Sequence, residues 1–278
     1  MEITLTIAGF IILGSLICEF IDSAFGMLYG TILSPVLIIV GFEPLLVVPS
    51  ILFSQAIGGS TASIFHHRLK NVDFSLKSVD PSYIRTRLAQ LGYKESFNRG
   101  TTKDLKVSIC VVCFGVMATI VSSLIAVNIP KVVLKTYIGM LVLIMGIILL
   151  SKAKFNFSWR KIIAVGILSA FNKGISGGGF GPVVTSGQII SGRDGKGSIG
   201  TTALTEVPIC VTGFLVYLLT KGIPNWNLLL LLTGGAVIGA MIGPYFTARF
   251  KSEKRLKIIL EVLTVGLGIW TLTKSWLI

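Results

Sequence analysis

Long apolar runs separated by short basic stretches dominate this chain of 278 residues. A bilayer core about 30 Å thick requires about 20 apolar residues per spanning helix, and many runs approach that length. In chain order they cover residues 3–25, 28–41, 45–65, 105–127, 132–150, 162–175, 180–190, 199–219, 228–246 and 258–276. The pattern predicts an all-α integral membrane protein with eight to ten transmembrane segments.

A constant spacing of 151 residues relates the two halves of the chain. Four pairs of residues share this spacing: Gly26 with Gly177, Gly30 with Gly181, Gln55 with Glu206, and Asp22 with Lys173. Interrupted hydrophobic segments at matching positions in two halves point to the binding site of a secondary transporter. Since each half holds five runs, an odd number, the halves face opposite ways. We therefore predict two inverted repeats, residues 1–151 and 152–278.

The runs 28–41 and 180–190 are too short for a full span, and each follows a glycine-rich break. They either cross the membrane or are re-entrant half-helices. The orientation of the remaining segments is unchanged when each short run pairs with the run before it, so both interpretations stay open.

Basic residues are concentrated between the apolar runs. The chain has 25 Lys and Arg against 12 Asp and Glu, a net charge of +13, yet only 13% of its residues are charged. The basic stretches 66–106, 152–161 and 249–257 follow the positive-inside rule when all three are cytoplasmic. This distribution predicts a multi-pass inner (plasma) membrane protein with a cytoplasmic loop at 66–104, surrounded by membrane lipids. It argues against a nucleic-acid partner.

The glycine-rich breaks are candidate substrate-binding elements. Their glycines, which would free the chain near the bilayer midplane, are Gly26, Gly30, Gly177, Gly178, Gly179 and Gly181. The helix that starts after each break directs N-terminal amides with a partial positive charge at the cavity, where anions bind. Two facing N-termini would form a pocket for a small oxyanion. The alternative is close helix packing by small residues.

Charged residues deep in the apolar runs are the other candidates. Lys173 lies inside a run, and a cation at that depth usually faces a site, which favours an anionic substrate; a structural lysine paired with an acid is the alternative. Asp22, at the equivalent position, predicts a buried pair of opposite charge with Lys173. Asp22 and Glu206 are candidates for proton coupling, or serve structural hydrogen bonds. Glu19, one turn before Asp22, can share its cavity.

Polar uncharged side chains near the breaks are candidate hydrogen-bond donors to a substrate. They are Ser23, Ser54, Gln55, Ser176 and Thr205. Hydroxyl groups in membranes also satisfy helix carbonyls, so each serine or threonine has two interpretations.

The remaining polar chemistry is sparse. Four cysteines lie inside apolar runs, and Cys110 and Cys113 have CxxC spacing without a second pair, which favours small apolar packing. The two histidines, His66 and His67, adjoin a run and are expected to be solvated at the interface. No metal-ligand cluster, nucleophile motif or P-loop is present. We expect no metal, no cofactor and no enzyme activity.

The segments IDSAFGMLYGTILSPVLIIVGFEPLLVVPSILFSQ and FNKGISGGGFGPVVTSGQIISGRDGKGSIGTTALTE resemble the two half-repeats of the TauE/SafE family. The resemblance extends over nearly the whole chain. It implies a transporter of sulfite, thiosulfate or organosulfonates, an exporter or permease driven by ion gradients without ATP. Where many members carry a glycine cluster in the first repeat, this chain reads FGMLYG, which is typical of a divergent branch.

Together, these patterns predict a secondary transporter of a small anion. It would work by alternating access at a midplane site between the two repeats. An anion channel without coupling is the alternative, and a homodimer is left open.

Overall fold

The structure is a computed structural model that describes residues 4–75, 89–90, 101–126, 158–222 and 225–252, with scattered positions at 136–147 and 255–273. The predicted runs 132–150 and 258–276 lie largely outside the described residues and stay predictions.

The described ranges form long helices joined by short turns. The helices are α1 (Leu5–Phe25), α2 (Tyr29–Ile39), α3 (Pro44–Arg68), α5 (Lys103–Ile125), α7 (Trp159–Ser176), α8 (Phe180–Ile190), α9 (Gly195–Lys221) and α10 (Trp226–Arg249). Each predicted run that corresponds to one of these helices begins and ends within four residues of the helix boundaries. Among the described residues, five helices are long and apolar enough to cross a membrane: α1, α3, α5, α9 and α10. The prediction of an all-helical membrane protein is confirmed.

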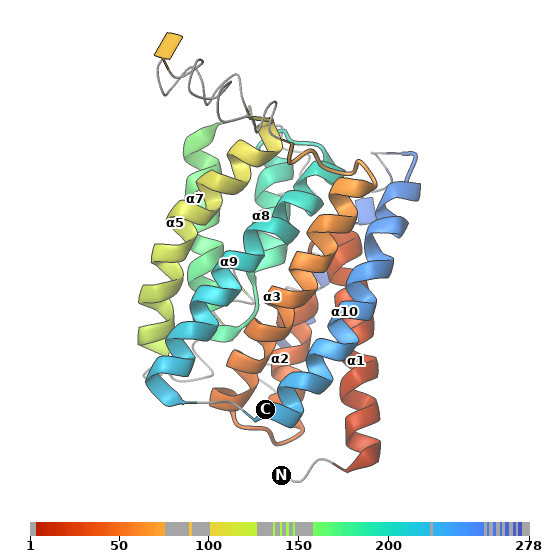
Figure 1. Cartoon of the computed structure of the whole chain (residues 1–278), viewed down its shortest axis with the longest axis vertical. Coiled ribbons are helices and arrows are strands. Elements are labelled where there is room, and N and C mark those ends of the chain that lie inside the picture. Colours follow the sequence, from red (N-terminus) through yellow and green to blue (C-terminus); the bar gives the residue numbers. More distant parts are fainter. Residues whose placement is uncertain are drawn as a thin grey trace.

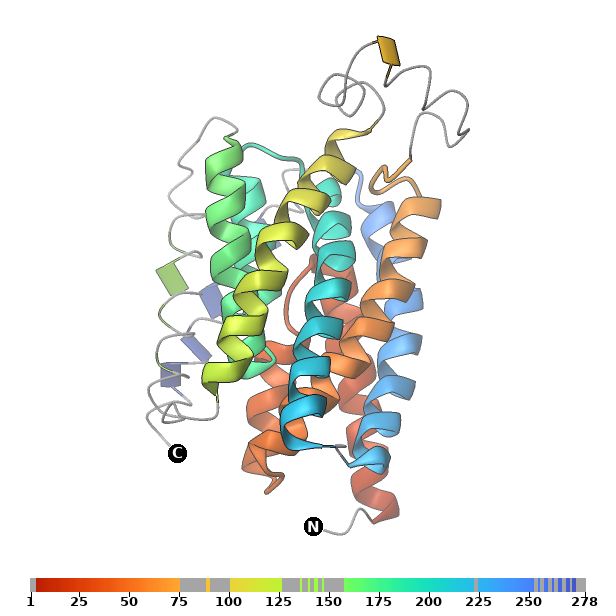
Figure 2. The same ribbon diagram turned by 60° about the vertical axis from the view of Figure 1, so that its left-hand side comes forward.

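The two short runs form half-helices. α2 and α8 have 11 residues each, about 16 Å at a rise of 1.5 Å per residue, which is about half of the hydrocarbon core. α2 lies in the lower half of the molecule and α8 in the upper half (Figure 1). Each returns toward the end from which the preceding helix, α1 or α7, started (Figure 2). This arrangement favours the re-entrant interpretation over a full crossing.

Corresponding helices of the two halves make corresponding contacts. α1 packs mainly along α10, and α7 packs along α5; α3 packs on α9 and α10, and α9 packs on α3 and α5. Exchanging α1 with α7, α3 with α9 and α5 with α10 therefore reproduces the same set of contacts. α1 and α7 also run in opposite directions (Figures 1 and 2). Both observations are consistent with the predicted inverted repeats.

One end of the molecule collects the basic helix termini. The C-terminal ends of α3 and α10 and the N-terminal ends of α5 and α7 all lie at the upper end in Figure 1. These termini carry basic residues such as Arg68, Arg160, Lys161 and Arg249. The arrangement agrees with the expectation that the basic stretches share one side of the membrane.

A buried ion pair fastens the turn between α8 and α9 to this end. Arg193, 3% exposed, pairs through Nη2 with Asp104 Oδ1 on α5. Its Nη1 donates to Gln188 Oε1 and, at 3.2 Å, to Thr201 Oγ1. Asp104 Oδ2 also accepts from the backbone N–H of Asp73 at 2.9 Å. Arg193 thus connects the end of α8 and the start of α9 to the start of α5.

We expect Asp104→Asn to lower the free energy of unfolding by about 2 kcal/mol. Removing one partner of a fully buried pair costs roughly 3–5 kcal/mol, and the Asp104 side chain is 20% exposed, which reduces the cost. Thermal unfolding in detergent measures the effect. Glu43→Gln, at an exposed position before α3, is the matched control. Equal melting temperatures for the two variants would contradict the prediction.

Candidate functional site

Four residues related by the 151-residue spacing meet in the buried interior of the helix bundle. Lys173 Nζ lies 2.7 Å from Glu206 Oε1 and donates a second hydrogen bond to Gln55 Oε1. Gln55 Nε2 donates to Asp22 Oδ2 at 3.1 Å. The four side chains form a continuous chain, which we call the central tetrad, with one member each from α1, α3, α7 and α9. None is more than 8% exposed.

Left-handed glycines follow the helix turns that carry Asp22 and Lys173. α1 ends at Gly26 with φ 74°, and α7 ends at Gly177 with φ 72°, a conformation that glycine adopts without steric cost. Asp22 and Lys173 each lie four residues earlier, in the last helical turn. A cation there complements the helix dipole of α7. A carboxylate does not, and Asp22 is instead stabilised by the first amide of α2, with Tyr29 N 3.2 Å from its Oδ1.

We expected Lys173 to form its ion pair with Asp22, and this prediction is wrong about the partner of Lys173. Lys173 forms its salt bridge with Glu206, in its own half. The side chain of Gln55 lies between the two charges, accepting from the ammonium and donating to the carboxylate. An amide can do both at once, so it connects the halves without bringing the opposite charges together.

The two glycine breaks pack backbone against backbone. A methyl group on Gly30 would overlap the carbonyl oxygen of Gly177. One on Gly181 would lie 2.5 Å from Gly26 O, and one on Gly178 would lie 2.7 Å from Gly30 O. Close packing, the alternative considered from the sequence, therefore describes these contacts. A role of these glycines in substrate binding stays a prediction.

The second break is also closed by a hydroxyl from the first half. Gly179 N donates to Thr31 Oγ1 at 3.1 Å. As with Tyr29 N and Asp22, an N-terminal amide that could bind an anion is occupied by a side chain from α1 or α2.

Most of the predicted hydroxyl donors bond to helix carbonyls. Ser23 Oγ donates to Glu19 O at 2.7 Å, Thr205 Oγ1 to Thr202 O at 3.0 Å, and Ser176 Oγ to Asn172 O at 2.9 Å. A contact of these groups with substrate stays a prediction.

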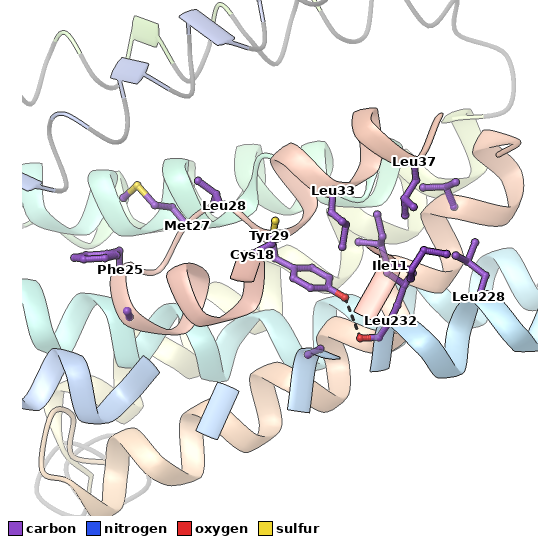
Figure 3. Packing of buried hydrophobic residues seen from close by; sticks show 14 of the residues in the cluster. Ile11, Cys18, Phe25, Met27, Leu28, Tyr29, Leu33, Leu37, Leu228 and Leu232 are labelled. Carbon is purple, nitrogen blue, oxygen red and sulfur yellow. Dashed lines mark hydrogen bonds between the residues drawn. The ribbon is translucent and has the colours of Figure 1, made fainter. Parts of the chain in front are cut away.

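Ser54 belongs to a separate network around Tyr29. Its Oγ lies 2.8 Å from the Tyr29 hydroxyl, which also lies 3.0 Å from Ser15 Oγ and 3.5 Å from Leu232 O. Figure 3 shows the Tyr29 ring reaching from α2 to α10 among apolar side chains that include Ile11 and Leu33. Tyr29, which was not among the predicted site residues, ties a half-helix to α1, α3 and α10.

Among the described residues, two buried side chains, one on α1 and one on α7, have polar atoms without a hydrogen-bond partner. Glu19 is 1% exposed and its Oε2 is unpartnered; Asn172 is fully buried, and both polar atoms of its amide are unpartnered. Sequence reasoning missed Asn172, although an amide inside an apolar run and next to Lys173 was an available signal. Buried polar groups are nearly always hydrogen-bonded, so both are candidates for contact with a ligand.

The expectation that His66 is solvated at the interface is wrong. Its ring is fully buried, with Nε2 2.8 Å from Ser23 O and Nδ1 3.0 Å from Asn71 Nδ2. Asn71 also donates to Pro244 O at 2.9 Å. The chain folds back after α3 and covers the histidine, which local sequence did not indicate.

Among the described residues, no group of three or more His, Cys, Asp or Glu side chains could hold a metal ion. Cys18 and Cys210 are buried free thiols, and Cys113 is exposed on α5. The described central site offers charge and hydrogen bonding.

Comparison with known proteins identifies the family. The model of the sulfite exporter TauE/SafE family matches residues 95–271. The chain belongs to this family. The TauE/SafE match includes α5 and residues 152–271 of the second half, with Lys173 and Glu206, whereas Asp22 and Gln55 lie outside it.

Two relatives extend the comparison. The probable membrane transporter protein YtnM of Bacillus subtilis (strain 168) is 22% identical over 279 residues, which cover 94% of this chain and 81% of YtnM. The probable membrane transporter protein YdhB of the same organism is 32% identical over 114 residues, 39% of this chain and 46% of YdhB. No solved structure matches. The chain is thus a multi-pass membrane transporter of the TauE/SafE family, which fits the expectation that it is not an enzyme.

Proposed function

We propose that the protein is a secondary transporter of a small sulfur oxyanion or organosulfonate, such as sulfite or thiosulfate. It works as an exporter or permease by alternating access at the central tetrad. The observation that carries the proposal is the position of Lys173, a cation 1% exposed where the two halves meet. A buried cation in a membrane protein commonly marks a substrate pathway.

An oxyanion would bind by replacing the present partners of Lys173. The ammonium now contacts Glu206 and Gln55, and the unpartnered amide of Asn172 comes from the adjacent position. Charge-assisted hydrogen bonds from an ammonium to an oxyanion are strong. When the substrate takes Lys173, the centre gains negative charge, which a proton on one of its carboxyls would offset. The carboxyls predicted from the sequence, Asp22 and Glu206, thereby become candidates for proton coupling.

Exchange of partners on Lys173 also supplies a mechanism for opening. Gln55 links the first half to Lys173 in the second, and the two glycine breaks touch beside it. A substrate that releases Gln55 weakens this contact between the halves, which allows the half-helices to separate toward one side or the other. Alternating access in transporters with inverted repeats consists largely of such rocking around a fixed site.

An anion channel is the second candidate function. The tight backbone contact of the breaks and the burial of the tetrad favour an occluding carrier over an open pore. In either case we propose that the protein lies in the inner (plasma) membrane, with its basic helix ends in the cytoplasm.

Flux into proteoliposomes tests the proposal. We expect saturable uptake of at least one of sulfite, thiosulfate, sulfate or methanesulfonate, accelerated by a pH gradient. Current that rises without saturation and ignores the gradient would indicate the channel. Failure of the reconstituted protein to move any of these anions would overturn the proposed function.

A further inference from the structure

Glu19 is the carboxylate of this centre that has no counter-charge of its own. It lies on α1 one turn before Asp22, is 1% exposed, and its Oε2 has no hydrogen-bond partner among the residues that the structure describes. By contrast, Glu206 pairs with Lys173, and Asp22 accepts from Gln55 and from Tyr29 N. Because an unpaired buried charge costs several kcal/mol, Glu19 in its ionised form would be the least stable member of the cluster.

The charge count of the centre is unbalanced. Three carboxyls, those of Glu19, Asp22 and Glu206, face a single ammonium, that of Lys173. Fully ionised, the cluster would be negative before any substrate arrives, and an anion would increase the imbalance. Low-dielectric surroundings oppose such a state. Protons must therefore bind to the carboxyls when an anion binds to the lysine.

We infer that Glu19 carries the proton that moves with the anion, while Asp22 and Glu206 organise the tetrad. This inference rests on the proposed transport function and names the residue and the ion that couple it. The anion on Lys173 and the proton on Glu19 enter and leave the centre together, so that the loaded site stays close to neutral.

The second half of the chain lacks an equivalent of Glu19. At the 151-residue spacing, Glu19 corresponds to Ala170 and its neighbour Gly58 to Ile209. A methyl group on Gly58 would lie 2.9 Å from Glu19 Oε1, so the small residue makes room for the carboxyl. In the second half Ala170 and Ile209 are fully buried and pack together beside Gly115. The first half thus holds a buried carboxyl at a position where the second half has apolar packing.

The surroundings of Glu19 favour a proton over a metal cation. The titratable and charged groups that act on it come from α1, α2, α7 and α9; they are Cys18, Asp22, Tyr29, Lys173, Glu206 and Cys210. α3 and α10 meet it with Gly58 and Gly239. Metal cations require several oxygen ligands, and among the described residues no group of three or more His, Cys, Asp or Glu side chains could hold one. A proton requires one oxygen atom, and Oε2 is available.

Thermodynamic linkage gives the expected behaviour. An anion on Lys173 raises the proton affinity of Glu19, and by reciprocity a proton on Glu19 raises the anion affinity. In the wild type, apparent affinity should therefore fall as the pH rises. In Glu19→Gln, whose neutral amide resembles the protonated carboxyl, the affinity should be nearly independent of pH.

The test uses the full chain in proteoliposomes that contain a pH-sensitive dye. Thiosulfate and methanesulfonate are the probes because both are fully ionised near neutral pH and bring no proton of their own. In the wild type we expect uptake of at least one probe with proton movement in the same direction. In Glu19→Gln we expect the number of protons moved per labelled probe taken up to fall by at least about tenfold.

Glu43→Gln, which removes an exposed carboxyl, is the matched control and should behave like the wild type. If the wild-type protein moves neither probe nor any of the other anions named above, the proposed function itself is wrong. Anion transport without proton movement, or proton movement that persists in Glu19→Gln, leaves the transporter intact and overturns the assignment of Glu19.

A measurement on the wild type covers the case in which Glu19→Gln does not fold. Dicyclohexylcarbodiimide labels protonated carboxyls in apolar surroundings, and mass spectrometry locates the label. We expect Glu19 to be labelled, and more rapidly at pH 6 than at pH 8. Labelling that spares Glu19 would contradict its role.

Discussion

Lys173→Met is expected to reduce anion uptake by at least about 100-fold, because the variant removes the positive charge from the centre and leaves three carboxyls there. Truncating one partner of a buried, hydrogen-bonded charge pair in a binding interface costs roughly 2–5 kcal/mol, and each 1.4 kcal/mol corresponds to a factor of ten in affinity. Uptake of labelled thiosulfate or sulfite into proteoliposomes measures the effect. Lys221→Met, at the exposed C-terminal end of α9, is the matched control and should transport normally.

Stability separates the transport role of Lys173 from a structural one. In Lys173→Met the carboxyl of Glu206 and the amide oxygen of Gln55 lose their donor, so the single variant should also melt at a lower temperature. In the double variant Lys173→Met/Glu206→Gln no unpaired charge remains at this pair. It should recover most of the melting temperature but none of the uptake. If uptake returns together with stability, the lysine serves only to hold the halves together.

The spacing of 151 residues predicted most of the central tetrad. It placed Asp22 and Lys173 before the two breaks, and Gln55 and Glu206 on the helices after the short runs. In the predicted inverted repeats, such equivalent positions would approach the same axis. The partners could not be read from it. Whether Lys173 bonds to Asp22 or to Glu206 depends on rotamers and on the intervening amide of Gln55, which a spacing does not contain.

Other features depend on segments that meet only in three dimensions. Asn71, after α3, covers His66 and reaches Pro244 on α10, so the burial of the histidine cannot be inferred from its place at the end of an apolar run. Glu19 was recognised as a neighbour of Asp22. The sequence does not indicate that Gly58 on α3 packs against its carboxyl, or that Oε2 has no partner among the described residues, because both depend on how the helices pack.

For the glycine breaks, the sequence left two interpretations open, a binding pocket and a close backbone contact. The two differ in whether an added methyl group lowers substrate binding or the free energy of unfolding. As a binding pocket, the breaks would tolerate a methyl group and lose substrate. As a backbone contact, they would lose stability. The described structure has backbone atoms of one break against those of the other, and backbone cannot move aside as the tip of a flexible side chain can. Packing should therefore decide the outcome at Gly30, whereas conformation should decide it at Gly177.

Gly30→Ala is accordingly expected to lower the free energy of unfolding by roughly 3 kcal/mol or more, because the added methyl overlaps the carbonyl of Gly177 and forces the halves apart. Gly177→Ala finds space, its nearest neighbours being 3.6 Å away, but its φ of 72° costs about 1–2 kcal/mol for a residue with a side chain. Gly9→Ala, with no atom within 4 Å of the new methyl, should be neutral or slightly stabilising. Melting temperatures in detergent should thus rank Gly30→Ala below Gly177→Ala and both below Gly9→Ala. A Gly30→Ala protein that melts like the wild type but no longer takes up anion would instead support an open pocket between the two breaks.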